Sequence, residues 1–390
     1  MLGRLDPSNL KRALGEWFDG RLARATFAGG ELLVMQNGQE LCRIAGGVAD
    51  ARTGRRVGRK AMYRLASMTK PVTGLAALVA VREGWFSLDD EVRNHLQEFD
   101  GMDVGAVVDG KVVRDRKARG VIHIWQLLSH CSGVLAGTEI GGRILSSAPP
   151  EAFGSLRDSV SFAASQPLSF DPGEGAAYSA YAAFDAVARI IEIKSGMRYS
   201  EFLSRFLFTP LGIVDTTFHP TPGQWRRMVA MHDRTESGGL AVVELPHGTV
   251  FEGFPDTYEC AGAGLAGTMD DFAKIAQLMC NQGSVGGVTL VDADLFREFA
   301  KPRVPDGVPG RAPNDSWGLG VCVKVRGDRL PEGCFGWSGA YGTHFWVDPG
   351  NGIVAILMRN MRWHDTHGAG ETGAEFERIV MSCLERKLSI

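Results

Sequence analysis

Short strand patterns at both ends of the chain, separated by a long helical stretch, are the feature that most constrains the fold. Near the N-terminus, residues 31–36 and 40–45 have the composition of strands. An Asn-Gly pair at residues 37 and 38 separates them, and this pair is a strong hairpin signal. Near the C-terminus, further short strands are predicted over 317–325, 334–337, 343–347 and 353–358. One sheet built from the two chain ends would pair these segments.

The stretch between these ends shows mainly helical periodicity with loops. Helices are predicted over 124–128, 181–194, 199–207 and 270–280, and a last one over about 373–387. This order predicts an α/β (α+β) fold in which an antiparallel sheet, flanked by helices, carries an inserted and mainly helical lobe. The sheet domain is expected to comprise residues 1–85 and 312–390, and the helical domain residues 86–311. The active site is expected in the cleft between them.

Composition limits the class of partner. The 390 residues include 42 basic and 45 acidic side chains, and a net charge of -3 creates no global field that would recruit nucleic acid or an anionic membrane. No segment approaches the roughly 18 apolar residues of a spanning helix, and the N-terminus lacks the apolar core of a secretion signal. We therefore expect a cytoplasmic protein. The seven cysteines are scattered without a C-x-x-C pair, which favours reduced thiols over disulfides or zinc.

The stretch Ser-Met-Thr-Lys at residues 67–70 places a hydroxyl and an amine three residues apart, at the start of a long apolar segment. Residues 71–84 predict a buried helix with proline in its first turn and glycine at its end. Residues three apart share a helix face, so Lys70 projects toward Ser67. The alternative is a helix cap, which we expect for the same spacing at residues 8–11. The apolar surroundings of Ser67 favour a nucleophile.

Two further elements carry groups that could assist a nucleophile. Tyr178 follows a loop rich in proline and glycine and immediately precedes a predicted helix, where catalytic groups often lie. The second element, Gly-Trp-Ser-Gly-Ala-Tyr-Gly-Thr at residues 336–343, joins two predicted strands. Its small residues would let a substrate lie against the strand, and a main-chain N–H there could bind an oxyanion. Taken alone, Tyr178 would more often be a packing residue, and the second element a tight turn with a core tryptophan.

Together and in this order, the three elements resemble the motifs of serine β-lactamases and penicillin-binding proteins. The likeness is greatest to class C β-lactamases and family VIII carboxylesterases, and it covers about residues 20–385. It implies that Ser67 is the nucleophile and that Lys70 and Tyr178 share its proton, with the choice of general base open. The remaining site residues that it implies are the backbone N–H groups of Ser67 and Ala340 as the oxyanion hole, and Trp337, Ser338, Gly339 and Tyr341 as substrate-binding residues. It implies no metal and no organic cofactor.

Two departures from the β-lactamase pattern bear on the substrate. Trp337 stands where β-lactamases carry the lysine of Lys-Thr-Gly, so the cation that would meet a β-lactam carboxylate is absent. Ala180 stands at the third position of the tyrosine motif, which is usually asparagine. Both departures resemble the esterase branch and predict a serine carboxylesterase that cleaves short-chain esters through an acyl-enzyme on Ser67. The alternatives are an amidase or D-aminopeptidase, a weak β-lactamase, a transacylase, or a non-catalytic ligand sensor, and the oligomeric state stays open.

Two further patterns resemble functional sites, and one familiar catalytic motif is absent. Residues 262–267 match G-x-G-x-x-G, but no apolar strand precedes them, so we expect a wall of the cleft and not a dinucleotide site. The chain has no G-x-S-x-G elbow, which argues against an α/β-hydrolase triad. His364 and His367 lie three apart in a polar loop without an evident third ligand, so a solvated loop is expected there.

Overall fold

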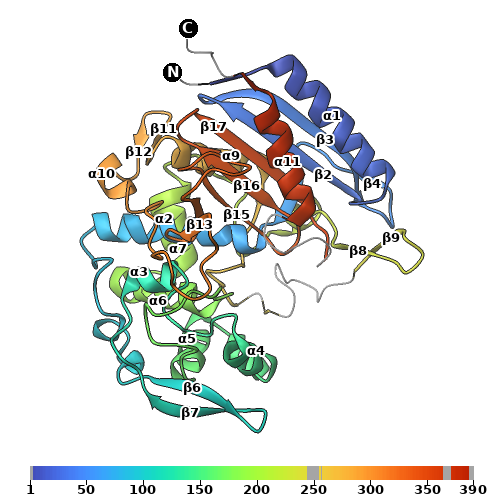
Figure 1. Ribbon diagram of the computed structural model, residues 1–390. Helices are drawn as coiled ribbons and strands as arrows, with labels where there is room; N and C mark the ends of the chain where they lie inside the picture. Colours follow the sequence, from blue (N-terminus) through green and yellow to red (C-terminus); the bar gives the residue numbers. More distant parts are fainter. Residues whose placement is uncertain (1–2, 244–253, 256, 363–369, 386–390) are drawn as a thin grey trace.

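The computed structural model describes residues 3–243, 254–255, 257–362 and 370–385. Its centre is an eight-stranded antiparallel sheet of order β13-β14-β15-β16-β17-β2-β3-β4, in which strands from both ends of the chain are neighbours (Figure 1). The strands are β2 (Gly29–Gln36), β3 (Gln39–Asp50), β4 (Arg55–Arg56), β13 (Asp315–Trp317), β14 (Cys322–Lys324), β15 (Phe335–Ser338), β16 (His344–Asp348) and β17 (Ile353–Arg359). The predicted sheet from the two chain ends is therefore confirmed.

The junction between the two chain ends is the pairing of β17 with β2, which runs from Ile353 opposite Gln36 to Arg359 opposite Gly30. Turn residues set the register of the hairpin that follows. Asn37 and Gly38 both have positive φ, 52° and 77°, as a tight two-residue β-turn between twisted strands requires. The predicted Asn-Gly hairpin is confirmed, and it places β3 at the outer side of β2.

Helices cover both faces of the sheet. On one face lie α1 (Pro7–Ala23) and α11 (Gly370–Ser382), and on the other lies α9 (Met269–Cys280), which packs against β16 and β17 (Figure 1). β17 is buried throughout, and its residues alternate between the two hydrophobic clusters, so each face of this strand serves a separate core. The site described below lies on the α9 side. No helix in the described residues is long and apolar enough to cross a membrane.

The middle of the chain forms the helical region in the lower part of Figure 1. Its helices are α3 (Ile124–Leu128), α4 (Glu139–Ser146), α5 (Leu156–Ser165), α6 (Ala182–Ser195) and α7 (Tyr199–Leu203). The hairpin of β6 (Asp103–Val108) and β7 (Lys111–Lys117) was not predicted, although Asp-Gly at 109–110, both with positive φ, marks its turn. The predicted boundaries of the two domains stay a prediction, since α9 falls within residues 86–311 yet covers the sheet.

Three predicted elements differ in detail from the structure. The strand expected over 317–325 is broken into β13 and β14 because the chain turns between them, with Gly320 at a φ of 78°. The helix expected over 199–207 ends as α-helix at Leu203 and continues as a π-helical turn over Ser204–Phe208. The last helix starts earlier and ends earlier than expected, at Gly370 and Ser382.

One long helix and several short elements complete the fold. They are α2 (Thr69–Arg82), which is the predicted buried helix, α8 (Pro222–Trp225), α10 (Ala293–Phe296), β1 (Arg4–Leu5), β5 (Met62–Arg64), β8 (His232–Arg234), β9 (Leu240–Val242), β10 (Ala266–Thr268), β11 (Ser284–Val285), β12 (Val288–Thr289), β18 (Leu384–Glu385), and 3-10 turns over Ala66–Met68, Val92–Asn94, Gln97–Phe99 and Pro150–Phe153. Three of them bear on the site, because α2 carries Lys70 and β5 pairs with β10 directly ahead of the turn that carries Ser67.

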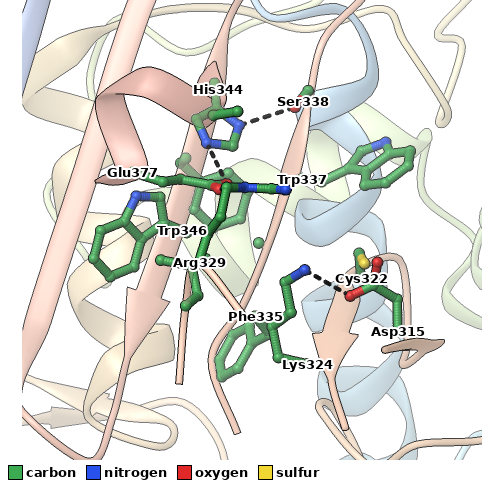
Figure 2. Close-up of a pocket in the computed structure, with 14 residues that line it drawn as sticks. Asp315, Cys322, Lys324, Arg329, Phe335, Trp337, Ser338, His344, Trp346 and Glu377 are labelled. Carbon is green, nitrogen blue, oxygen red and sulfur yellow. Dashed lines mark hydrogen bonds and ion pairs between the residues drawn. The ribbon is translucent and has the colours of Figure 1, made fainter. Parts of the chain in front are cut away.

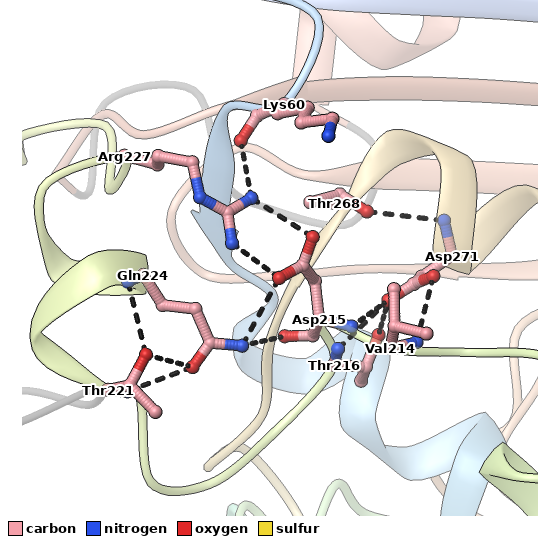
Figure 3. Close-up of polar contacts among 9 residues, drawn as sticks. All are labelled: Lys60, Val214, Asp215, Thr216, Thr221, Gln224, Arg227, Thr268 and Asp271. Atoms are coloured by element: carbon pink, nitrogen blue, oxygen red, sulfur yellow. Dashed lines mark hydrogen bonds and ion pairs between the residues drawn. The ribbon is translucent and has the colours of Figure 1, made fainter.

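The start of α9 is held by a buried carboxylate. Asp271 accepts hydrogen bonds from the main-chain N–H groups of Val214, Asp215 and Thr216, at 3.3, 2.7 and 2.9 Å (Figure 3). The hydroxyl of Thr268 caps the helix by accepting the N–H of Asp271 at 3.3 Å. These bonds connect the segment after α7 to the start of α9.

Candidate active site

Ser67 lies on a sharp turn between a strand and a helix. β5 ends at Arg64, the 3-10 turn Ala66–Met68 follows, and α2 begins at Thr69. Ala66 has a φ of 46°, in the left-handed region that alanine rarely occupies, so the backbone is strained immediately before Ser67. Ser67 remains partly exposed while the residues around it are buried. The turn therefore presents the hydroxyl of Ser67 outward from the buried end of α2.

The predicted Ser67, Lys70 and Tyr178 come together at this turn. Lys70 Nζ lies 3.3 Å from Ser67 Oγ, as expected for residues one helical turn apart. Tyr178, from the segment just ahead of α6, places its Oη 2.6 Å from the same Oγ. The serine hydroxyl thus has an amine on one side and a phenol on the other, and either could exchange a proton with it.

Two main-chain carbonyls hold the amine of Lys70. Its Nζ donates to the carbonyl oxygen of Ala180 at 2.7 Å and to that of Gly262 at 2.9 Å. Both carbonyls can only accept, so these two bonds take up two N–H groups and leave the third direction of Nζ facing Ser67. The side chain of Lys70 is fully buried, and Nζ also lies 4.6 Å from the centre of the Tyr178 ring.

The sequence alone does not indicate that the carbonyls of Ala180 and Gly262 bind Lys70. Ala180 lacks the side-chain amide of the β-lactamase motif, yet its main-chain oxygen contacts the lysine. Gly262 belongs to the run predicted as a wall of the cleft, and a Cβ at this glycine would lie 2.5 Å from the Ala180 oxygen. Only glycine lets the two segments approach closely enough for both oxygens to converge on Lys70. A glycine-rich run is the one sequence signal for this contact.

Aromatic side chains fix the position of the Tyr178 phenol. Trp337 Nε1 donates a hydrogen bond to Tyr178 Oη at 3.3 Å, and the two rings lie 5.4 Å apart. The rings of His130 and Trp317 lie 4.6 and 6.1 Å from that of Tyr178. Burial, with the charge of Lys70 acting in the same direction, lowers the pKa of His130 well below its usual value, so this imidazole is neutral. His130 therefore acts here as a packing partner.

The strand β15 reaches the turn that carries Ser67. At Gly339, a Cβ would lie 2.2 Å from Thr343 Oγ1 and 2.3 Å from the Leu65 oxygen, so only glycine permits this approach. The N–H of Ala340 has no hydrogen-bond acceptor within the part of the chain that the structure describes. The second N–H group predicted for the oxyanion hole, that of Ser67, lies on the adjacent turn Ala66–Met68. The oxyanion hole predicted from these two groups is compatible with this placement and stays a prediction.

The other two predicted substrate-binding residues lie differently. Ser338 faces α11, where its Oγ lies 2.9 Å from His344 Nδ1, while His344 Nε2 lies 3.3 Å from the Glu377 carboxylate (Figure 2). These residues line a cavity of about 310 Å³ that also includes Trp337 but not Ser67. Tyr341 is fully buried in the main core. A direct contact of Ser338 or Tyr341 with substrate therefore stays a prediction, and His364 and His367 lie outside the described residues.

Comparison with known proteins identifies the family of the chain. Residues 14–370 match the family described as Beta-lactamase. The chain belongs to the beta-lactamase family. The resemblance inferred from the three sequence motifs is thereby confirmed. Among its relatives, esterase EstB of Burkholderia gladioli is 29% identical over 392 residues, covering 93% of this chain and 94% of the relative. Penicillin-binding protein 4* of Bacillus subtilis is 25% identical and covers 92% of this chain and 72% of the relative.

Solved structures of the same fold cover nearly the whole chain. One is EstCE1, a hydrolase with promiscuous acyltransferase activity, with a TM-score of 0.77, 21% identity, and coverage of 97% of this chain and 98% of that one. Another is a family VIII carboxylesterase, with a TM-score of 0.74, 17% identity, and coverage of 96% and 98%. At these identities the likeness concerns the fold, and it confirms the predicted fold class of this family member.

Proposed function

We propose that this family member is a serine carboxylesterase that cleaves small-molecule, short-chain esters through an acyl-enzyme on Ser67. The observation that carries the proposal is the position of Tyr178 Oη, 2.6 Å from Ser67 Oγ, with Lys70 Nζ 3.3 Å away on the other side. A packing tyrosine or a capping serine would not require this convergence. The 29% identity with esterase EstB over nearly the whole chain supports the ester as substrate class.

The proposed reaction has two steps. Ser67 Oγ attacks the ester carbonyl as its proton passes to the phenolate oxygen of Tyr178, and the oxyanion that forms is bound by the N–H groups of Ser67 and Ala340. Tyr178 then returns the proton to the leaving alcohol, and an acyl-enzyme remains. In the second step, water loses a proton to Tyr178 and attacks the acyl group, and Ser67 leaves with that proton. No step draws on a metal or an organic cofactor.

The hydrogen bonds around Tyr178 support the tyrosine as general base over a neutral Lys70. The indole N–H of Trp337 can only donate, and it points at the phenol oxygen. In the structure the phenol donates to Ser67 Oγ at 2.6 Å. Once the phenol has lost that proton, its oxygen can accept hydrogen bonds from both Trp337 and Ser67, which is the arrangement that stabilises a tyrosinate. Lys70 as an ammonium adds a positive charge 4.6 Å from the same ring. On the other side, the amine of Lys70 donates to two main-chain carbonyls.

Neutral substrates fit the groups near Ser67 better than β-lactam carboxylates do. Trp337 replaces a lysine at the family's third motif, and His130, the nearby imidazole, is neutral. The pairing of β14 with β15 ends at Gly336, so the strand beyond it can lie along a substrate. A buried ammonium at Lys70 is already engaged by main-chain oxygens. We therefore propose an uncharged acyl group and an uncharged alcohol.

A second candidate is acyl transfer to an alcohol other than water. The relative named ML-236A carboxylate methylbutanoyltransferase, from Penicillium citrinum, is 31% identical over 189 residues, which is 45% of this chain and 43% of the relative. The same acyl-enzyme would serve either reaction, because the acceptor enters only after the first alcohol has left. Product analysis with added alcohols distinguishes them: an ester product that grows with alcohol concentration indicates a transacylase.

A cytoplasmic location and the absence of membrane partners stay predictions.

Ser67→Ala tests the proposed function directly. Hydrolysis of a short-chain p-nitrophenyl ester should fall to the background rate because the nucleophile is gone, while the thermal unfolding midpoint stays close to that of the parent. Ser8→Ala is the matched control, because Ser8 begins the chain's other Ser-x-x-Lys spacing at the exposed start of α1 and should leave turnover unchanged. Fluorophosphonate labelling followed by peptide mapping should modify Ser67. Retained turnover in Ser67→Ala, or an unlabelled Ser67, would exclude the mechanism.

A further inference from the structure

A buried carboxylate lies behind Lys70 and contacts neither Ser67 nor Tyr178. Asp185, on the first turn of α6, has no exposed surface. Its carboxylate accepts hydrogen bonds from the hydroxyl of Tyr258, from Ser159 Oγ at 2.7 Å, and from the main-chain N–H of Ala261 at 2.9 Å. A fully buried carboxylate is costly unless it is paired and hydrogen-bonded. The mechanism proposed above does not use this residue.

The bond from Ala261 connects Asp185 to the lysine. Asp185 holds the N–H of Ala261, while the hydroxyl of Thr73 on α2 donates to the oxygen of the same residue at 2.7 Å. The peptide unit that follows supplies the carbonyl of Gly262, which accepts from Lys70 Nζ at 2.9 Å. The main chain at Ala261 is thus held on both sides, and this fixes where the next carbonyl oxygen lies.

The same carboxylate also compensates the buried charge. Among the described hydrogen bonds of Lys70 there is none to a carboxylate, although its side chain is fully buried. Burial raises the pKa of Asp185 to about 6, and the hydrogen bonds of Tyr258, Ser159 and Ala261 and the charge of Lys70 act in the opposite direction. At neutral pH the carboxylate is therefore ionised. The attraction between a buried ammonium and a buried carboxylate offsets part of what their desolvation costs.

We propose that Asp185 is a positioning residue for the Ser67 reaction: it fixes the Gly262 carbonyl on Lys70 and supplies the buried counter-charge of the ammonium. The proposal rests on the hydrolase function proposed above and adds a residue that does not touch the reacting atoms. Its effect passes through Lys70 to the proton held between Ser67 and Tyr178. The residue is separated from the nucleophile by a layer of main chain, so a defect there should affect turnover more than substrate binding.

Asp185→Asn keeps the size of the side chain and removes its charge. We expect kcat to fall about tenfold or more with KM changed little, since displaced catalytic groups cost turnover of this order. The alkaline limb of the pH–kcat profile should move to lower pH, because the ammonium loses its counter-charge. The titratable groups that face Asp185 or interact with its charge are Tyr258, Lys70, Tyr181, Tyr199 and Cys260.

Asp271→Asn is the matched control, because Asp271 is an equally buried carboxylate that holds main-chain N–H groups, at the start of α9 (Figure 3). It should lower the unfolding midpoint while leaving kcat and the alkaline limb unchanged. Tyr258→Phe, which removes one donor to Asp185, gives a milder second test and should lower kcat in the same direction. It also serves if Asp185→Asn fails to fold.

Each outcome decides the proposal. A folded Asp185→Asn protein with the parent's kcat and pH profile would overturn it, as would an equal loss of kcat in Asp271→Asn. If Asp185→Asn fails to fold, an unchanged kcat in Tyr258→Phe would overturn it as well. Ser67→Ala is measured in parallel, so that the two failures can be distinguished. If the hydrolase function is wrong, Ser67→Ala retains turnover. If the Asp185 role is wrong, Ser67→Ala is inactive while Asp185→Asn retains the turnover of the parent.

Discussion

Replacing Trp337 by phenylalanine tests whether an indole N–H makes Tyr178 an effective base. The donor Nε1 lies 3.3 Å from Tyr178 Oη, and the indole also packs 4.5 Å from the Trp317 ring. A phenyl ring keeps most of the aromatic contact and removes only the hydrogen bond. The variant therefore changes the charge stabilisation at the phenol oxygen more than it changes the shape of the site.

The size of the effect follows from the geometry. A hydrogen bond to a charged group contributes about 1.5 to 3 kcal/mol, and 3.3 Å is longer than the usual N–H···O distance, so the lower end applies. About 1.4 kcal/mol corresponds to a factor of ten in rate and to one pH unit. We expect kcat/KM at neutral pH to fall about tenfold, and the acidic limb of its pH profile to move to higher pH. The deficit should shrink as the pH rises, because the phenolate then forms without help.

The assay is hydrolysis of a short-chain p-nitrophenyl ester over the neutral and mildly alkaline range, corrected for spontaneous hydrolysis. Trp346→Phe on the neighbouring strand is the control, because Trp346 is buried and its Nε1 has no partner among the described residues. It should leave the pH profile unchanged. A loss of equal size at every pH in Trp337→Phe would refute the reasoning, and so would an unshifted acidic limb, since either would reduce Trp337 to a packing residue.

Two other substitutions test catalysis and stability separately. Tyr178→Phe removes the hydroxyl 2.6 Å from Ser67 Oγ and should lower kcat by about 100-fold or more with little change in the unfolding midpoint; a near-parent rate contradicts this. Asp171 is buried, and its two carboxylate oxygens accept hydrogen bonds from the guanidinium of Arg116 at 2.9 and 2.7 Å. Arg116, together with Arg119, holds the pKa of Asp171 well below the ordinary value of 3.8. Its stabilisation is thus present above about pH 4 and is lost as the pH falls through the lower folded value. Asp171→Asn should cost about 1 to 2 kcal/mol at neutral pH by urea unfolding, since both arginines are partly exposed, and the difference should disappear only in strong acid; equal neutral stability contradicts this.

The sequence was sufficient for the features that depend on short-range spacing. The three-residue separation of Ser67 and Lys70 puts both side chains on one helical turn wherever that helix lies. The Asn-Gly pair at 37–38 sets a hairpin by its backbone preferences alone, and the strand patterns at both chain ends predicted their common sheet. Three motifs in the right order were enough to identify the family. The order of segments also predicted that the middle of the chain would be helical.

The tertiary structure decided which groups surround these residues. Tyr178 is 111 positions from Ser67, and the carbonyl of Gly262 is 192 positions from Lys70, so no local periodicity relates them. Their convergence depends on how α6, the 260–262 segment and β15 pack around the end of α2. Ala180 shows this most clearly. Its side chain lacks the amide that would contact the lysine, but its main-chain oxygen accepts a hydrogen bond from Lys70. Backbone carbonyls are present at every residue, and only packing selects the two that hold a buried lysine beside its serine.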